Sequence, residues 1–344
     1  MDTEKESSAE NNSSMNFLFP LSALIIVLAG TIYAKPIIVP LLLSVFIAII
    51  CAPAMDFLEK MHLPRIVAFI IVIAVVIGFL TGVGVILGNS VNDFSNHMPV
   101  YKERLNDLTD SAVSFAEKYR IPISKTQILK KFNPSSLFSV GGYIISAVGN
   151  MLSQTLLIFV TVAFILFESS TFGRKIETMR LVDDVNETPL NLFTDNIKRY
   201  LAIKTLTSLL TAVLVVAILL VAGVDYPMLW GMLAFFLNFI PAIGAFLAAI
   251  PVVLMALIQF GPGNAIGVAV AYTVVNVAIG NFIEPKFMGK GLGLSPLVVF
   301  LSLVFWGFCL GPAGMFLSVP LTMTLKLACD SRTKTKWIGI LLGP

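Results

Sequence analysis

The residues that could do chemistry in this sequence are glycines, prolines and amides that interrupt long apolar runs. One such run is interrupted at 238–244 (NFIPAIG), and another at 306–314 (WGFCLGPAG). Because proline and glycine break helices, backbone N–H and C=O groups there lose their intrahelical partners. In a membrane such groups are tolerated only where protein, water or a polar ligand satisfies them. The predicted chemistry is hydrogen bonding to a polar, oxygen-rich solute.

Side chains near these breaks can contribute to such a site. Pro241 and Pro312 each suit the first turn of a helical arm, whose N-terminus directs partial positive charge toward the break. Neutral hydrogen bonds are available from Asn238, Asn276, Asn281 and Ser318. The alternative is that the glycines and prolines only permit close helix packing and kinks.

Glu284 is the first acidic residue after the uncharged segment 226–283. As a functional carboxylate it would bind a cation or carry a proton. As a structural one it would lie at the membrane interface and pair with Lys286 or Lys290. Both readings stay open at the level of sequence.

Enzymatic and cofactor sites find little support. The two histidines lie in polar loops, and the sequence contains no HExxH, GxSxG or GxxxxGK[ST] motif. Cys51, Cys309 and Cys329 lie in apolar runs without a CxxC pair, which predicts free thiols and no metal site. The net charge of +3 gives no argument for a nucleic-acid partner. We expect a protein that is not an enzyme and has no cofactor.

The composition shows which elements must position these residues. Of 344 residues 57% are hydrophobic and only 12% are charged, against about 25% charged in soluble domains. A bilayer-crossing helix needs roughly 20 apolar residues. Stretches at least that long without Asp, Glu, Lys or Arg occupy 11–34, 36–55, 66–92, 132–167, 205–224, 226–283 and 291–325. This pattern predicts an all-α polytopic membrane protein surrounded by lipid.

The two interrupted runs predict re-entrant hairpins in addition to about six full spans, because arms of 12–15 residues are shorter than a bilayer-crossing helix. The segment 241–251 (PAIGAFLAAIP) also resembles 312–320 (PAGMFLSVP), and each follows a Trp-Gly pair, as in an inverted repeat. The expected organisation is a mobile polar tail (1–16), three spans (17–92), a small helical extramembrane cap (93–131), two spans joined by the polar linker 168–200 (132–224), a hairpin–span–hairpin transport region (226–328) and a cytoplasmic tail (329–344).

The distribution of basic residues predicts the topology, since cytoplasmic loops are enriched in Lys and Arg. With the N-terminus inside, the hairpin arrangement places Lys286 and Lys290 in the cytoplasm. It also keeps the basic C-terminal segment there. Both termini are therefore expected to be cytoplasmic.

Several motifs in the last third occur in a recognisable order. They are WGMLAF (230–235), NFIP (238–241), GNFIEP (280–285), MGKGLGLSPLVVFLS (288–302), WG (306–307) and GPAGMFLSVPLT (311–322). Together they resemble the autoinducer-2 exporter family, and within it the branch that transports this quorum-sensing signal. The resemblance covers about 17–330.

The resemblance implies a homopentameric bacterial inner-membrane protein. It also implies two hairpins that hold the substrate and an elevator-like movement that exports autoinducer-2, a small polyhydroxylated signal. Matching positions imply a site formed by Asn238, Pro241, Gly244, Glu284, Gly291, Gly293, Ser295, Gly311, Pro312 and Pro320. Other family members are associated with sodium or lithium/proton antiport. A cation/proton antiporter therefore remains an alternative, as does a non-transporting scaffold or channel.

Overall fold

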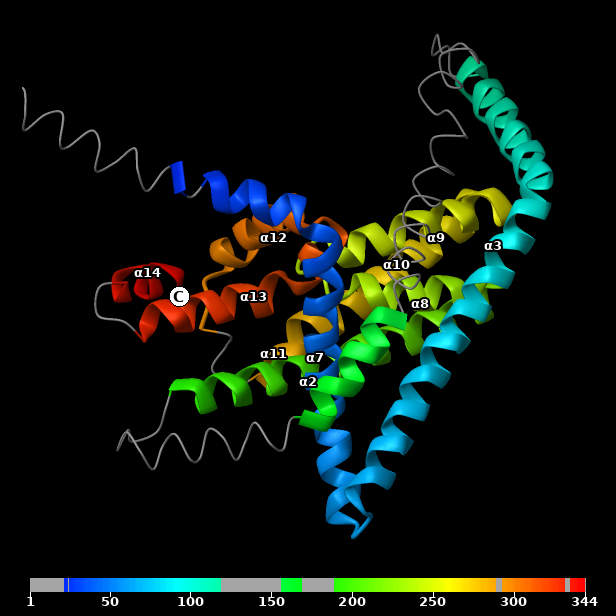
Figure 1. Ribbon diagram of the computed structural model, residues 1–344. Helices are drawn as coiled ribbons and strands as arrows, with labels where there is room; N and C mark the ends of the chain where they lie inside the picture. Colours follow the sequence, from blue (N-terminus) through cyan, green and yellow to red (C-terminus); the bar gives the residue numbers. More distant parts are fainter. Residues whose placement is uncertain are drawn as a thin grey trace, which may run out of the picture.

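The computed structural model describes residues 22–23, 25–118, 156–168, 189–288, 293–331 and 335–343. Within these ranges all regular secondary structure is helical (Figure 1). Besides short helical segments at 25–33 and Leu156–Glu168, the helices are α2 (Lys35–Lys60), α3 (Arg65–Lys118), α7 (Pro189–Ala222), α8 (Pro227–Leu237), α9 (Gly244–Phe260), α10 (Pro262–Val277), the π-helix η1 (Ala278–Ile283), α11 (Glu284–Met288), α12 (Pro296–Leu310), α13 (Pro312–Asp330) and α14 (Lys336–Leu342).

Five helical segments of the described chain are long and apolar enough to cross a membrane. They are Lys35–Lys60, Arg65–Phe94, Asn196–Ala222, Pro262–Phe287 and Pro312–Asp330. This confirms the all-helical, multi-span class. The expected number of about six spans and the re-entrant path of the hairpins stay predictions, because the expected spans at 17–34 and 140–167 lie partly outside the described residues.

Helix α3 joins two segments that the sequence separated into a span and a cap. It runs without interruption from Arg65 to Lys118, over 54 residues, or about 80 Å at 1.5 Å per residue. Figure 1 shows it along one edge of the molecule. The remainder of the expected cap, 119–131, and the expected polar tail, 1–16, lie outside the described residues.

Three tight turns arrange the helix pairs α7–α8, α9–α10 and α12–α13 as antiparallel neighbours. Gly261 alone separates α9 from α10, and Gly311 alone separates α12 from α13. Their φ angles are +82° and +72°, in a region that glycine adopts without the steric cost of a Cβ. The turn from α7 to α8 contains Gly223 and Tyr226, also at positive φ.

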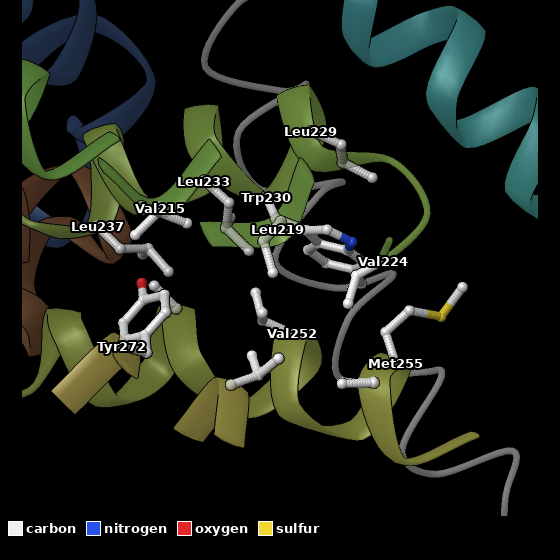
Figure 2. Packing of buried hydrophobic residues seen from close by; sticks show 14 of the residues in the cluster. Val215, Leu219, Val224, Leu229, Trp230, Leu233, Leu237, Val252, Met255 and Tyr272 are labelled. Atoms are coloured by element: carbon white, nitrogen blue, oxygen red, sulfur yellow. The ribbon is translucent and has the colours of Figure 1, made fainter. Parts of the chain in front are cut away.

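The hydrophobic core of the described residues has two parts. One apolar cluster joins α7, α8, α9 and α10, with Leu229 and Leu233 facing Val252 and Met255 (Figure 2). The other joins α2, the segment Leu156–Glu168, the first half of α7 and the start of α13. The break between α8 and α9 lies where these two clusters adjoin, because Leu237 belongs to the first and Phe239 to the second.

A polar network joins the extension of α3 to the end of the first cluster. The Tyr101 hydroxyl donates to Asp225 Oδ2 at 2.8 Å, and Trp230 Nε1 donates to Asp225 O at 2.9 Å. The Gln259 amide also donates to the Asp225 carboxylate. Burial raises the pKa of Tyr101 above its usual range, and hydrogen bonds with Tyr226 and Asp225 raise it further. Tyr101 is therefore a neutral donor that ties α3 to the α7–α8 turn.

Replacing Tyr101 with Phe keeps the ring and removes only this donor. We expect a loss of about 1 kcal/mol in stability, the usual net value of one hydrogen bond. Thermal unfolding of the purified protein in detergent measures it. Tyr33→Phe is the matched control, since Tyr33 is 91% exposed. Equal unfolding midpoints for Tyr101→Phe and wild type would contradict the structural role.

Candidate functional site

The turn between α8 and α9, which we call the first tip, consists of residues 238–243. Ile240 N donates to Leu237 O at 2.8 Å, which closes the end of α8. Ala242 has φ +59°, a conformation that residues other than glycine seldom adopt. Pro241 lies within this turn and not in the first turn of α9, which begins at Gly244. The expectation that Pro241 opens the second arm is therefore wrong, because the chain needs three further residues to reverse.

The turn between α12 and α13, the second tip, is the single residue Gly311. It ends α12 and begins α13, and Pro312 occupies the first turn of α13 as expected. The Lys35 ammonium lies beside Gly311, where a Cβ would contact it. Trp306 Nε1 donates to Thr322 Oγ1 at 3.0 Å and joins the two helices of this pair.

Both tips place a glycine against a backbone carbonyl of the preceding helix. A Cβ on Gly244 would overlap Leu237 O, and a Cβ on Gly314 would overlap Trp306 O. These glycines occupy matching positions in the two similar segments, 241–251 and 312–320. The similarity between segments 241–251 and 312–320 thus has a structural counterpart. In each of the two helix pairs, α8–α9 and α12–α13, the two backbones come close together only where a glycine leaves no side chain between them.

The first tip packs through an aromatic side chain against the early part of α13, just after the second tip. Phe239 of the first tip and Phe316 of α13 have ring centroids 4.5 Å apart. Phe46 of α2 contacts both, at 6.0 Å from Phe239 and 5.1 Å from Phe316. Two segments that are more than 70 residues apart in the sequence are therefore held side by side. Helix α2 packs against both of them.

A buried polar line runs along α7 beside the first tip. Lys204, Thr207, Ser208 and Thr211 are all buried, and their spacing of three and four places them on one face of the helix. Asn238 Nδ2 donates to Ser208 Oγ at 3.0 Å. The threonine hydroxyls bond to carbonyls of their own helix, Thr207 to Lys204 O and Thr211 to Thr207 O. The amide of the first tip thus joins a line of neutral hydroxyls.

Glu284 forms a buried ion pair with Lys204 at one end of this line. Lys204 Nζ lies 2.9 Å from each carboxylate oxygen. The Lys204 and Glu284 side chains are only 9% and 16% exposed. The sequence suggested Lys286 or Lys290 as partners; Lys286 is exposed, and Lys290 lies outside the described residues. Within this pair the two buried charges balance each other.

Glu284 follows directly on the π-helix η1, which interrupts the α-helical hydrogen bonding of the preceding span. π-helical turns are rare in proteins, and those that do occur are found frequently at functional sites. Arg199 Nη2 also donates to Phe287 O at 3.3 Å. The first half of α7 therefore holds α11 through both an ion pair and a hydrogen bond to the backbone.

The other predicted site residues on α10 and η1 do not join the tips. The Asn276 amide donates to Tyr272 O of its own helix at 2.9 Å. Asn281 lies on η1 with its side chain exposed. In the described structure neither amide donates to a tip residue: Asn276 bonds to its own helix and Asn281 is exposed.

Two predicted residues lie at the start of α12. We call this end of the second helix pair, α12–α13, its base, because it is opposite the turn at Gly311. Gly293 has φ +65° and its carbonyl accepts a hydrogen bond from Lys326. Ser295 is the N-cap of α12, and its hydroxyl accepts from Val298 N at 3.2 Å. Gly291 lies outside the described residues.

Ser318 and Pro320 lie within α13 and are buried. The Ser318 hydroxyl donates to Met315 O at 2.8 Å, within its own helix. Pro320 lacks the N–H that would continue the helical hydrogen bonds, and its ring displaces the carbonyl four residues earlier. That carbonyl belongs to Phe316, whose ring contacts Phe239 of the first tip.

Sequence reasoning did not find Lys204, Ser208, Phe239 and Phe316 as site residues. The spacing of Lys204, Thr207, Ser208 and Thr211 was a usable signal, because polar residues on one face of an apolar helix predict a buried polar contact. The Phe239–Phe316 contact had no comparable signal, since phenylalanine is abundant, with 26 in the chain.

The described structure also contains two buried hydroxyls without a hydrogen-bond partner. They are Thr205 Oγ1 on α7 and the Tyr272 hydroxyl on α10. Tyr272 is 2% exposed, and its hydroxyl points toward Leu237 and Val215 (Figure 2). A buried hydroxyl without a partner is costly unless a ligand or water satisfies it.

A multi-pass helical protein whose helices break inside apolar segments, with neutral polar groups at a break, has the architecture of a membrane transporter. The comparisons with known proteins agree with this class. The model of the AI-2E family transporters matches residues 21–333. The chain therefore belongs to the AI-2E transporter family, and it is a multi-pass inner-membrane protein.

Relatives cover nearly the whole chain. A putative transport protein of Haemophilus influenzae is 37% identical over 344 residues, with 97% of this chain and 98% of the relative aligned. The AI-2 transport protein TqsA of Escherichia coli is 33% identical, with 96% of each chain aligned. The putative transport protein YhhT of Escherichia coli is also 33% identical, with 98% of this chain and 97% of the relative aligned.

The packing at the tips predicts that alanine is not tolerated at Gly244 or Gly314. A methyl group there must displace a backbone carbonyl, and overpacking of this kind costs about 1–3 kcal/mol. Thermal unfolding measures the loss. Gly267→Ala on α10 is the control, because no atom lies within 4 Å of the added Cβ. Unchanged midpoints for both tip variants would refute this account of the tips.

The ion pair predicts strong coupling between Lys204 and Glu284. Removing one partner, as in Lys204→Met or Glu284→Gln, leaves a buried unpaired charge and should cost about 3–5 kcal/mol. The double variant Lys204→Met/Glu284→Gln should recover most of this loss. A thermal double-mutant cycle measures the coupling. Additive losses in the double variant would show that the two charges do not interact.

Proposed function

We propose that this chain is a secondary transporter that exports a small, neutral, oxygen-rich solute of the autoinducer-2 type. In this proposal α8–α9 and α12–α13 are re-entrant hairpins whose tips hold the solute. The observation that carries it is the contact of Phe239 in the first tip with Phe316 on α13, close to the second tip. The buried hydroxyls of α7 lie beside the first tip. The name of TqsA, which identifies that relative as an AI-2 transport protein, supports the choice of solute.

The charge balance favours a neutral solute over a cation. Cation transport through a membrane commonly uses a buried carboxylate that is free to bind the ion or a proton. Segment 226–283 contains no charged residue, and Glu284 at its end is already paired with Lys204. A polyhydroxylated molecule needs hydrogen bonds and not a counter-charge.

Hydrogen-bonding groups for such a solute are available near the first tip. Asn238 bonds to Ser208, and its amide can exchange this hydroxyl for one on the solute. The Tyr272 hydroxyl is buried and unpartnered and points toward Leu237, the residue before the tip. The aromatic cluster supplies an apolar wall against the carbon face of a furanone-derived ring.

The elevator-like movement, the homopentamer and the cytoplasmic position of both termini also belong to this proposal. The contacts of α2 with the tips support a moving unit, because Phe46 meets Phe239 and Phe316 through ring faces and edges. Apolar contacts are non-directional, so the tips can shift past α2 without breaking specific bonds there.

Transport by the purified protein in liposomes tests the function. We expect wild-type protein to release loaded autoinducer-2 with or without a sodium gradient. The neutral double variant Lys204→Met/Glu284→Gln should keep this efflux, because it preserves packing and neutrality together. Using the double variant avoids the unpaired lysine that Glu284→Gln alone would create.

A tip variant provides the second arm of this experiment. Gly311→Leu should abolish efflux, because leucine is strained at φ +72° and would contact Lys35. Gly267→Leu, at a glycine with open space around it, is the matched control. Absence of autoinducer-2 efflux, together with cation-dependent proton movement that the double variant loses, would refute the proposal and identify an antiporter.

A further inference from the structure

The C-terminal helix α14 presents an apolar face that nothing in the described protein covers. Trp337, Ile340 and Leu341 are 61%, 69% and 67% exposed. Their spacing of three and four residues places them on one side of the helix. Gly339 is buried on the other side, and Leu342 packs against the second apolar cluster.

Helix α14 follows the C-terminal end of α13, at the base of the second helix pair. The candidate span Pro312–Asp330 ends six residues before α14 begins. Ser295 N, at the start of α12, donates to Leu342 O at 3.2 Å, and Thr335 Oγ1 donates to Cys329 O at 2.9 Å. Figure 1 shows α14 beside the C-terminal end of α13. The helix is therefore held at the base of this pair, next to the end of a candidate span.

The charge of this region is strongly positive. From Lys326 to Lys336 the sequence contains four basic residues and one acidic residue, Asp330. Lys336 is exposed beside Trp337. The Asp330 carboxylate packs against Gly339 of α14, where a Cβ would overlap it. The acidic side chain therefore faces the helix backbone.

We propose that α14 is an interfacial helix that binds anionic phospholipid. Trp337 would lie at the level of the lipid headgroups, as tryptophan prefers in membrane proteins. Ile340 and Leu341 enter the boundary between headgroups and acyl chains, and Lys336 contacts the lipid phosphate. The occupant is lipid because α14 adjoins a membrane span and carries positive charge next to its apolar face.

Lipid at α14 would also hold the base of the second helix pair. Lys326 donates to Gly293 O and lies near Gly343, just past the end of α14. Together with the Ser295–Leu342 bond, this contact joins α14 to the segment that leads into α12. An anionic lipid bound at α14 therefore fixes the end of the pair opposite its tip.

Lipid retention by the full-length protein tests the charge contribution. Native mass spectrometry of protein purified from mixed phosphatidylglycerol and phosphatidylcholine should show preferential retention of phosphatidylglycerol. One basic residue near an anionic surface contributes enough that Lys336→Glu should lower this preference by about tenfold. Lys102→Glu is the control, because Lys102 is exposed on α3 beyond the candidate span Arg65–Phe94.

Quenching of tryptophan fluorescence by brominated phosphatidylglycerol tests the position of the apolar face without changing charge. Trp337→Leu should remove the largest quenched component, since Trp230 is only 3% exposed and Trp306 is half-buried. Thermal unfolding verifies that each variant is folded. Equal phosphatidylglycerol preference in wild type and Lys336→Glu would overturn the proposal. Efficient disulfide cross-linking of Leu341→Cys between two copies would overturn it as well, by assigning the face to a protein interface.

Discussion

The rest of this structure depends on the close approach of backbone to backbone at the two helix breaks. A break inside an apolar segment exposes peptide groups that the surrounding lipid cannot satisfy. In this protein the start of α9 packs directly on the last turn of α8, and the start of α13 packs directly on the end of α12. Gly244 against Leu237 and Gly314 against Trp306 make this possible, because glycine adds no atoms between the two backbones. The same geometry in both pairs brings Phe239 and Phe316 together.

Charge neutrality is the second constraint on the site. The α7 span contains a lysine at a depth where an unpaired ammonium would be expensive. Its pairing with Glu284 removes that cost and joins α7 to the start of α11 immediately after the π-helix. The remaining polar groups at the first tip are amides and hydroxyls. A solute bound as proposed would be recognised by the positions of its hydrogen bonds and not by a counter-charge.

The two ends of the second helix pair have different environments. Near its tip, Phe316 of α13 contacts Phe239 of the first tip. At its base, Lys326 donates to Gly293 O, and Ser295 N donates to Leu342 O of the C-terminal helix. One end is thus held by contacts that tolerate sliding, and the other by directional hydrogen bonds.

The sequence by itself determined the membrane class and the positions of the helix breaks, because apolar run length and the backbone limits of glycine and proline are local properties. The expected arm length of 12–15 residues was too short for α9 and α13, which have 17 and 19 residues. The sequence also placed Pro312 in the first turn of its helix. It did not determine the register of Pro241, since the number of residues in a turn depends on how the two helices pack. Only the tertiary structure decided that Glu284 pairs with Lys204, that Asn238 meets Ser208, that Asn276 bonds to its own helix and that Asn281 is exposed. The Asn238–Ser208 and Lys204–Glu284 contacts join residues that are 30 and 80 positions apart in the sequence. They form because the helices pack against each other at these points, and the local sequence of one helix does not determine how it packs against another.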